Sequence, residues 1–274
     1  MLKLINKILS KLPFLSSKGV FMDYSTNYKL INPNSLRGSR KGHGVILSYL
    51  IGNEIVELIK VHTNYKNDET ILDVGCGDGR VASTLLRSNF KGKYYGFDIN
   101  KKRLKELRII FKNNLNINFT YVDIYHSYYN RKGNINPEEF VYPYDNYSSG
   151  LIIYNSIFSH QKISVIKHNL IEAKRVLKKD GRIWCTFYIK DDNYDSKQDN
   201  PSNRFFETVY DKGYTAVPEK PESAVGYDYG VITNLIDEIE LKIIKYIPGF
   251  WKKDRESRDQ HEQDVFVLSK NSII

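Results

Sequence analysis

Short apolar runs and longer amphipathic runs alternate along most of the chain from residue 69 onward. Runs rich in Ile, Val, Phe and Tyr are typical of buried strands, and the stretches between them repeat apolar residues at helical spacing. Strands that alternate with helices predict a parallel sheet of right-handed crossover units. The predicted strands are 69–74, 93–98, 117–122, 150–155, 182–189, 239–247 and 263–269, and the predicted helices are 45–61, 79–88, 101–114, 162–178 and 228–238.

Two connections are much longer than the others and interrupt this alternation. Residues 125–149 are rich in tyrosine, and residues 190–226 are polar with scattered proline and glycine. Loops of this length in a compact domain are usually functional or disordered. We therefore expect one α/β domain over residues 42–274 that carries both insertions, preceded by an N-terminal segment, residues 1–41.

Residues 1–12 have the pattern of an amphipathic helix that ends at Pro13. Lys3, Lys7 and Lys11 recur at every fourth position, and leucines and isoleucines occupy the other side. A helix of this kind lies on an anionic membrane surface or docks on protein. The lysines interrupt any signal-peptide core, so export is not expected. The segment is a candidate for peripheral contact with the inner membrane face or with a partner chain, a second copy of this protein included.

Composition narrows the class of protein without identifying it. A chain of 274 residues suffices for one sizeable α/β core, and 27% charged with 41% hydrophobic residues is ordinary for a globular protein. The net charge of +9 fits nucleic acid, an anionic membrane, an acidic substrate or a solvated basic surface. Cys76 falls in a glycine turn and Cys185 in a predicted strand. Their placement indicates neither a disulfide nor a metal site, and it favours the reducing cytoplasm.

The densest chemical signal follows the first strand of the domain. Gly75, Gly77 and Gly79 stand at alternate positions before a predicted helix, which lets a nucleotide-like ligand approach bare backbone. Dinucleotide sites have G-x-G-x-x-G instead, and here Asp73 and Asp78 add two carboxylates beside the turn. These charges repel a pyrophosphate and attract a cation. S-adenosylmethionine, which carries a sulfonium and an ammonium but no phosphate, therefore suits the turn better than NAD.

Five motifs in order resemble those of class I S-adenosylmethionine-dependent methyltransferases, most closely a bacterial branch with Ser-His after the fourth strand. They are Leu-Asp-Val-Gly-Cys-Gly-Asp-Gly (72–79), Tyr-Gly-Phe-Asp-Ile (95–99), Tyr-Val-Asp-Ile-Tyr (121–125), Tyr-Asn-Ser-Ile-Phe-Ser-His (154–160) and Glu-Ala-Lys-Arg-Val-Leu-Lys-Lys-Asp-Gly-Arg (172–182). Lys179 and Asp180 replace the usual Pro-Gly of the family, and a turn still fits there. The resemblance implies a Rossmann-like, seven-stranded, mostly parallel sheet with helices on both faces. Its antiparallel seventh strand lies between the fifth and the sixth.

Asp73, Asp98 and Asp123 stand at or just past the ends of three successive predicted strands. Because ligands of open α/β sheets bind at the carboxyl ends of the strands, we expect the three carboxylates to converge on one crevice. Helix N-capping is the alternative for any one of them. By resemblance, Asp73 faces the methionine ammonium, Asp98 accepts both ribose hydroxyls, and Asp123 meets the adenine amino group.

Gly75 and Gly77 are expected to bind the cofactor through their bare backbone. The resemblance also implies that the N-terminal segment, residues 1–41, covers the cofactor, and it adds Arg37, Ile99, Ile124 and Asn155 as cofactor-binding residues. A surface position explains Arg37 equally well, and core packing explains the two isoleucines nearly as well.

His160 is the first candidate for catalysis. It follows the fourth strand, beside the place where the resemblance implies that a methyl group is delivered. An alcohol acceptor must lose a proton, and a histidine with an ordinary pKa near 6.5 accepts one at neutral pH. A structural histidine that caps a helix or holds a hydrogen bond explains the position almost as well. His126, in the tyrosine-rich insertion, is the second candidate.

The acceptor pocket is expected where the loop of residues 248–262 reaches the cofactor edge, since the resemblance makes the last strand antiparallel. Its expected rim residues are Tyr125, Trp251, His261, Gln263 and Asp264. Aromatic faces beside hydrogen-bonding side chains suit a sugar, although tyrosine and tryptophan also fill cores.

The predicted function is O-methylation of a hydroxyl on a sugar or surface-polysaccharide precursor, a substrate class that rests on the resemblance. The alternatives are methylation of another small hydroxyl or amine metabolite, and an S-adenosylmethionine-binding interaction protein that has lost catalysis. A nucleic-acid substrate is disfavoured, because no Asn/Asp-Pro-Pro-Tyr motif follows the fourth strand.

Overall fold

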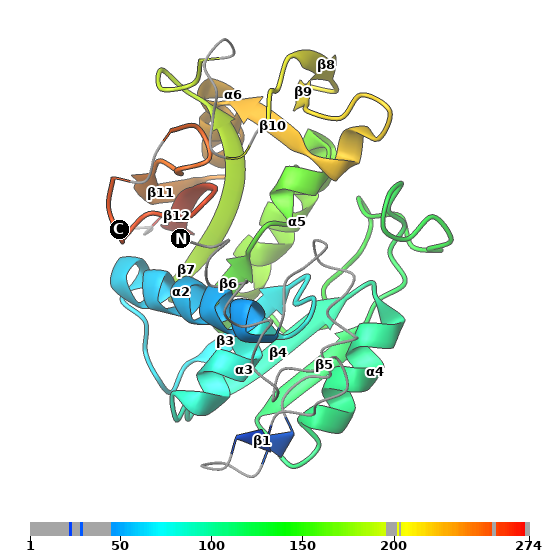
Figure 1. Cartoon of the computed structure of the whole chain (residues 1–274), viewed down its shortest axis with the longest axis vertical. Helices are drawn as coiled ribbons and strands as arrows, with labels where there is room; N and C mark the ends of the chain where they lie inside the picture. The colour runs from blue at the N-terminus through cyan, green and yellow to red at the C-terminus, as the bar shows by residue number, and fades with distance from the viewer. Residues whose placement is uncertain are drawn as a thin grey trace, which may run out of the picture.

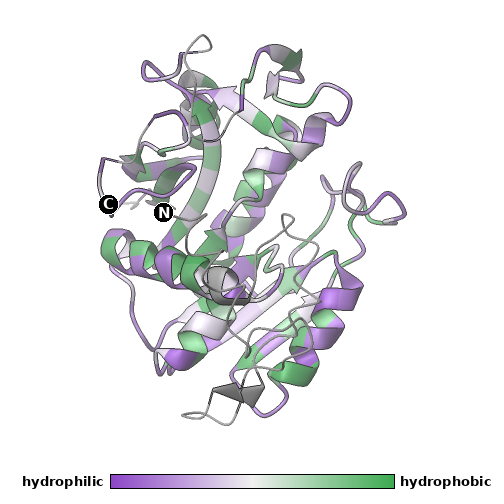
Figure 2. Cartoon of the chain, in the orientation of Figure 1, coloured by the Kyte–Doolittle hydropathy of each residue, from purple (hydrophilic) through white to green (hydrophobic). Residues whose placement is uncertain are grey.

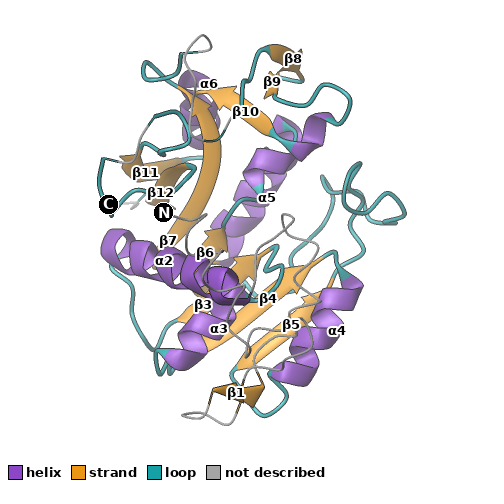
Figure 3. Ribbon diagram, viewed as in Figure 1, coloured by secondary structure: helices purple, strands orange, loops and turns teal. Residues whose placement is uncertain are grey.

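The computed structural model describes residues 22–23, 28–29, 45–195, 202, 204–253 and 256–271. The candidate helix of residues 1–12 and the candidate cofactor ligand Arg37 lie outside these residues. Two short strands, β1 (Met22–Asp23) and β2 (Tyr28–Lys29), pair antiparallel. The rest of the described chain forms one open sheet flanked by helices (Figures 1 and 3).

The seven predicted strands are all present and lie in the order β5-β4-β3-β6-β7-β12-β11. Their bounds are β3 (Thr70–Val74), β4 (Lys93–Asp98), β5 (Ile117–Tyr121), β6 (Ser149–Tyr154), β7 (Leu177–Lys190), β11 (Leu241–Ile247) and β12 (Asp264–Lys270). β12 is antiparallel to both β7 and β11, and the pairs from β5 to β7 are parallel. The predicted fold class and the place of the antiparallel strand are thereby confirmed. The strand order reverses at β3 and β6, so their carboxyl ends flank the switch point where ligands of such sheets bind.

Helices cover both faces of this sheet, because the strands are apolar on both sides. The helices are α2 (Val45–Thr63), α3 (Arg80–Arg87), α4 (Lys101–Ile110), α5 (Ile163–Val176) and α6 (Tyr229–Glu238). Along β6, Leu151 and Ile153 belong to the core under α2, α3 and α4, whereas Ile152 and Tyr154 belong to the core under α5 and α6. Figure 2 shows polar and apolar residues alternating along α4 and α5, as expected of helices with one buried side.

The turn expected at Lys179 and Asp180 is replaced by a bulge inside β7, which is strand from Leu177 onward. Ser149 of β6 pairs with Leu177 of β7, and Leu151 pairs with Arg182. The two pairs are thus two residues apart in β6 but five residues apart in β7. The extra residues bulge outward, so β7 starts earlier than the predicted strand of residues 182–189, and α5 ends at Val176.

The insertion of residues 190–226 is partly regular, which the sequence did not indicate. It contains the hairpin β8 (Thr208–Tyr210) and β9 (Gly213–Thr215), a short 3-10 helix η4 (Pro221–Ser223) and the start of β10 (Val225–Asp228). β10 pairs parallel with the last residues of β7. The sheet thus continues past the end of β6, and the insertion lies beside the carboxyl ends of β6 and β7.

Among the residues that the structure describes, no helix is both long and apolar enough to cross a membrane. Nor do three or more His, Cys, Asp or Glu side chains of these residues gather in a way that could hold a metal ion.

Candidate active site

The glycine turn joins β3 to α3 at the switch point. Gly75, Gly77 and Gly79 have φ of +69°, +52° and +69°, which favours glycine at each position. A Cβ on Gly75 would collide with Ile157, and one on Gly79 would lie 2.7 Å from Leu107. The nearest atom to a Cβ on Gly77 would be 3.8 Å away. Gly77 is therefore the glycine that leaves backbone open to a ligand, whereas Gly75 and Gly79 permit close packing within the protein.

Asp98, at the end of β4, faces this turn directly. Its Oδ2 accepts the backbone N–H of Gly77 at 2.8 Å, and its Oδ1 accepts that of Asn100 at 2.7 Å. Burial raises the pKa of Asp98, and these two hydrogen bonds oppose the rise. The carboxylate is thereby held in one orientation beside the turn.

Asp73 lies one strand away and is deeply buried. Its Oδ2 accepts the hydroxyl of Tyr94 at 2.5 Å. Burial raises its pKa to about 7, the hydrogen bond from Tyr94 lowers it, and the nearby charge of Asp98 raises it further. A cation beside these two carboxylates would relieve both desolvation and mutual repulsion. Tyr94 was not expected from the sequence, since an aromatic residue in a buried strand reads as core.

Asp78, in contrast, does not contribute to the acidic crevice. Its buried carboxylate pairs with Arg103 at 3.0 Å and with Arg80 at 3.8 Å. The expectation that Asp78 repels a pyrophosphate therefore needs correction: the unbalanced negative charge comes from Asp73 and Asp98.

Asp123 lies just past β5, at the same edge of the sheet. Its carboxylate accepts Tyr121 Oη at 2.7 Å, Asn134 Nδ2 at 2.7 Å and Asn130 Nδ2 at 3.4 Å. The hydrogen bond from Tyr121, followed by that from Asn134, lowers its pKa. Asp123 is thus held as an acceptor beside Ile124. Ile99 and Ile124 are both partly buried against the core, with part of each side chain left at the surface.

These residues fit the cofactor that the sequence suggests. The carboxylates of Asp73 and Asp98 lie near each other at the carboxyl ends of adjacent strands, and Asp98 accepts the backbone N–H of Gly77. A sulfonium nucleoside with an ammonium group offers the matching positive charge and hydroxyl donors. S-adenosylmethionine would be held by Asp73, Asp98 and Asp123.

The affinity for S-adenosylmethionine should depend on pH through Asp73. This carboxyl must be ionised to pair with an ammonium, and in the cofactor-free protein its pKa is about 7. Protons therefore compete with the ligand, and the affinity is expected to rise about tenfold from pH 5.5 to 7.0. Asp73→Asn should weaken binding and abolish this rise, as measured by titration calorimetry. Asp180→Asn, at the opposite edge of the sheet, should keep it; a pH-independent affinity in the unmodified protein would contradict this role.

His126 and His160 are 34 residues apart in the chain and lie together in the structure. The Nδ1 atom of His126 accepts the backbone N–H groups of Tyr128 at 3.1 Å and Tyr129 at 3.2 Å, so its proton is on Nε2, which donates to the carbonyl of His160 at 2.8 Å. Burial lowers the pKa of His126 and outweighs the charge of Glu222. His126 is therefore a neutral support for the loop of His160, with both ring nitrogens engaged.

His160, on the 3-10 helix η3 (Phe158–His160), is oriented by the second insertion. Its Nδ1 lies 3.1 Å from the backbone carbonyl of Glu222 and must donate to it, which leaves Nε2 as the basic nitrogen. Nε2 lies 3.5 Å from the hydroxyl of Tyr129, whose ring stands perpendicular to the imidazole. Ile157, three residues earlier, packs against Gly75, so this loop adjoins the glycine turn.

Glu222 joins the two insertions, and the sequence did not single it out. Its carboxylate accepts the hydroxyls of Ser127 and of Tyr210, the latter at 3.1 Å, while its carbonyl holds His160. The only sequence signal was the length of the 190–226 connection, because nothing local indicates which residue of a long loop reaches a site.

Gln263 and Asn155 lie beside the carboxyl end of β6. Gln263 is buried, and its Oε1 accepts the hydroxyls of Thr186 at 2.7 Å and Ser156 at 3.0 Å. Asn155 Oδ1 lies 3.4 Å from the indole nitrogen of Trp184. Both residues are thus at the expected edge of the sheet, and Gln263 fixes the backbone that leads to His160.

Four of the expected rim residues are buried instead, Gln263 among them. Trp251 has no exposed surface and packs against Tyr188 and Phe206. Asp264 is equally buried and accepts Trp251 Nε1 at 2.6 Å, and His261 is nearly buried beside Trp184. They pack in the interior instead of lining an acceptor pocket, and Trp251 belongs to an aromatic cluster beside β7. Tyr125 is 45% exposed, as a rim residue should be.

A glycine turn and paired carboxylates at a switch point define a nucleoside-binding class of α/β domain. A family model described as "Methyltransferase domain" matches residues 65–216, more than half of the chain. The chain belongs to this methyltransferase family; it is an S-adenosylmethionine-dependent methyltransferase with S-adenosylmethionine as its cofactor.

Solved structures share the fold at low identity. One is a chain of the complex between the Haloferax volcanii Trm112 methyltransferase activator and a putative methyltransferase (14% identity, 79% of this chain and 88% of that chain, TM-score 0.52). Another is a putative S-adenosylmethionine-dependent methyltransferase from Methanococcus maripaludis (14% identity, 88% of this chain and 92% of that chain, TM-score 0.50). A third is the [4+2]-cyclase SpnF (14% identity, 71% of this chain and 58% of that chain, TM-score 0.48). This chain spans little more than half the length of SpnF. Such likeness shows the fold alone.

Proposed function

We propose that this methyltransferase transfers the methyl group to a hydroxyl oxygen, with His160 as the general base, and that the acceptor is a sugar or glycan precursor. The observation that carries the proposal is the orientation of His160. Its Nδ1 donates to the carbonyl of Glu222, so its Nε2 is a proton acceptor, on the loop whose Ile157 packs against the glycine turn. A hydroxyl acceptor needs such a group, whereas a structural histidine does not need a basic nitrogen at the ligand edge.

Each residue of the site has a defined task in this reaction. When bound, S-adenosylmethionine supplies a methyl group on a sulfonium, open to in-line attack. Asp73 balances the ammonium, and Asp98 and Asp123 orient the nucleoside. His160 takes the hydroxyl proton at Nε2, and Glu222 holds the imidazole in that tautomer. Holding the acceptor oxygen in line with the methyl group contributes much of the acceleration.

Exposed tyrosines beside His160 support a sugar as the acceptor. Tyr125, Tyr128 and Tyr129 are 45%, 42% and 55% exposed, and Tyr129 contacts both histidine rings. A cluster of exposed aromatic side chains at a site marks a binding surface. Phenol rings pack against the C–H face of a sugar, and their hydroxyls pair with its edge. Another small hydroxyl or amine metabolite is the alternative acceptor.

The direct test is a screen for methyl transfer. The protein is incubated with S-adenosylmethionine and sugars, nucleotide sugars, glycan fragments, small amines or tRNA, and products are read by a mass increase of one methylene group. Methylation of a saccharide on oxygen is the expected result. Methylation of amines or tRNA alone would contradict the proposed acceptor, and no turnover with any acceptor would favour a cofactor-binding protein without catalysis.

Residues 1–12 bear on where the reaction takes place, which we propose is the cytoplasm or its membrane face. A helix of the length that the sequence predicts here is marginal in water and would need a surface that buries its apolar side. Near anionic lipid each of its three lysines gains roughly 1 kcal/mol. If it contacts the membrane, the full chain should float with anionic vesicles at low salt, and a chain lacking residues 1–12 should not. Failure of the full chain to float, with loss of an oligomer on deletion, would assign the segment to a partner chain.

A further inference from the structure

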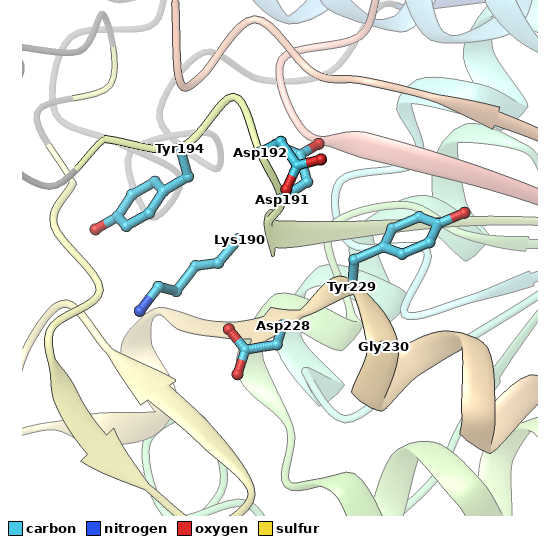
Figure 4. A pocket seen from close by; sticks show the side chains of 7 residues that line it. All are labelled: Lys190, Asp191, Asp192, Tyr194, Asp228, Tyr229 and Gly230. Atoms are coloured by element: carbon cyan, nitrogen blue, oxygen red, sulfur yellow. The ribbon is translucent and has the colours of Figure 1, made fainter.

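An open pocket lies apart from the candidate active site, where β7 ends and α6 begins. Its volume is about 410 Å³, within the range of small-molecule sites. Its lining residues are Lys190, Asp191, Asp192, Tyr194, Asp228, Tyr229 and Gly230. Figure 4 shows the rings of Tyr194 and Tyr229 on opposite sides, with Lys190 and the carboxylates between them.

One wall of this pocket is a rigid ionic network. Asp191 Oδ2 accepts Lys252 Nζ and Tyr246 Oη, each at 2.6 Å, and Lys252 also pairs with Asp264 at 2.8 Å. The Lys252 side chain is 1% exposed, so it neutralises Asp191 and Asp264 from inside the protein. Such a buried network holds the main chain of the pocket wall in one conformation.

The carboxylate of Asp228 is directed to the pocket rather than to its own helix. Asp228 occupies the N-cap of α6, where an aspartate ordinarily accepts a backbone N–H, but it makes no side-chain cap hydrogen bond. Instead its Oδ2 accepts the hydroxyl of Tyr214 at 3.1 Å. Lys190 Nζ lies 3.5 Å from the centroid of the Tyr214 ring. The side chain of Asp192, next to Asp191, is exposed. The pocket therefore presents hydrogen-bond acceptors and one donor at fixed positions.

The two aromatic walls are also held in place. Tyr194 packs against Trp251, with ring centroids 5.6 Å apart. Tyr229 packs against Tyr246 at 5.0 Å and Phe266 at 6.0 Å, yet 38% of it remains exposed. A partly exposed ring supported from behind offers a flat apolar surface at little entropic cost.

The charges of the pocket select its ligand. The two carboxylates of Asp191 and Asp264 pair with one ammonium, that of Lys252. The other charged lining residues are two carboxylates, Asp192 and Asp228, and one ammonium, Lys190. This excess of negative charge disfavours a phosphate, and hence a nucleotide sugar. It suits a ligand that donates hydrogen bonds from hydroxyls, accepts one from Lys190 and turns a C–H face to tyrosine, which is the chemistry of a neutral sugar ring.

The location of the pocket indicates how much of an acceptor it holds. Tyr154, the last residue of β6, pairs with Cys185, and Lys190 lies five residues further along β7, which is about 16 Å at 3.3 Å per residue. On the other side, Tyr227 donates to the carbonyl of Gln161 at 2.6 Å, so β10 connects the pocket to the residue next to His160. An acceptor of more than one sugar unit would therefore span both the pocket and the surroundings of His160.

We propose that this pocket binds a neutral sugar unit of an extended glycan acceptor, one or more units away from the sugar that is methylated. The inference rests on the proposed function for the identity of the acceptor, and on the pocket alone for the binding of a neutral sugar.

The test measures binding and turnover separately. The full chain, saturated with S-adenosylhomocysteine, is titrated with neutral trisaccharides of common hexoses, deoxyhexoses and N-acetylhexosamines, with their monosaccharides, and with UDP-glucose and spermidine as charged probes. Binding is followed by saturation-transfer NMR and calorimetry in the unmodified protein, Asp228→Asn and Tyr229→Ala. Asp237→Asn, an exposed carboxylate further along α6, is the matched control.

At least one neutral trisaccharide is expected to bind saturably, and both pocket variants should weaken it about tenfold or more while the control does not. For a trisaccharide that is methylated, Asp228→Asn should raise KM about tenfold at unchanged kcat and leave the corresponding monosaccharide unaffected. The proposal is overturned if no neutral saccharide binds, if Asp228→Asn binds as the unmodified protein does, or if only UDP-glucose or spermidine binds. Saccharide binding that depends on Asp228 without methylation of any saccharide would refute the proposed function and leave the pocket assignment standing.

Discussion

Replacing His160 by alanine is expected to lower turnover by about 10²- to 10⁴-fold, the usual contribution of a general base. The reason is the geometry of its ring, whose Nδ1 donates to the carbonyl of Glu222 and whose Nε2 is left to accept the proton of a hydroxyl. Binding of S-adenosylmethionine should stay near normal, because His160 belongs to the loop beside the glycine turn and not to the carboxylates that hold the cofactor. Single-turnover rates and calorimetry on the same variant separate the two quantities.

His62→Ala is the matched control, since His62 contacts Asp259 and Lys245 on the α2 side of the sheet. It should leave turnover unchanged. If turnover survives in His160→Ala, then deprotonation is not rate-limiting or another group performs it. His126 is a poor substitute because both of its ring nitrogens are engaged, so Tyr129, 3.5 Å from Nε2 of His160, becomes the next residue to replace.

The second large effect is expected for Asp98→Asn, which preserves shape but removes a carboxylate that accepts two hydrogen bonds. At about 100 times its Kd, S-adenosylmethionine should stabilise the unmodified protein by about 2.7 kcal/mol, or on the order of 5–10 °C in Tm for a domain of this size. Loss of a charged acceptor should weaken binding about 10- to 100-fold. At the same ligand concentration the stabilisation then falls to about 0.4–1.4 kcal/mol.

Thermal melts with S-adenosylmethionine, S-adenosylhomocysteine and NAD check this expectation. NAD should give no shift, because its pyrophosphate would lie beside Asp73 and Asp98. Asp180→Asn should respond as the unmodified protein does, since Asp180 is exposed at the other edge of the sheet, where it pairs with Lys66. An undiminished shift in Asp98→Asn would remove this residue from the cofactor site.

Local sequence predicted the elements of the sheet closely. The predicted strand of residues 93–98 coincides with β4, and the others agree within a few residues except at the start of β7. α4 ends at Ile110, earlier than the predicted residue 114, because a turn forms at Phe111 and continues to Asn114. Where hydrophobic periodicity is strong, the choice between strand and helix depends on nearest neighbours along the chain, and these are visible in the sequence.

The tertiary structure decided which polar residues meet. Asp73 and Asp98 converge because parallel strands end at one edge, which the strand pattern alone predicts. Asp78 and Asp264 look equivalent to them in the sequence, but Arg103 neutralises the first and Lys252 with Trp251 encloses the second. The burial and partners of a carboxylate depend on residues far away in the chain, so local pattern does not reveal them.

The sequence by itself determined the class of fold, the glycine turn and the position of His160 after the fourth strand. Only the tertiary structure decided how His160 is oriented, because its hydrogen-bond partner Glu222 lies 62 residues later in the chain, within the second insertion. Two long loops of weak local preference reach a single arrangement when Ser127, Tyr210 and His160 all bond to one glutamate. The physical reason is that hydrogen bonds between distant segments, rather than the propensity of either segment, stabilise that arrangement.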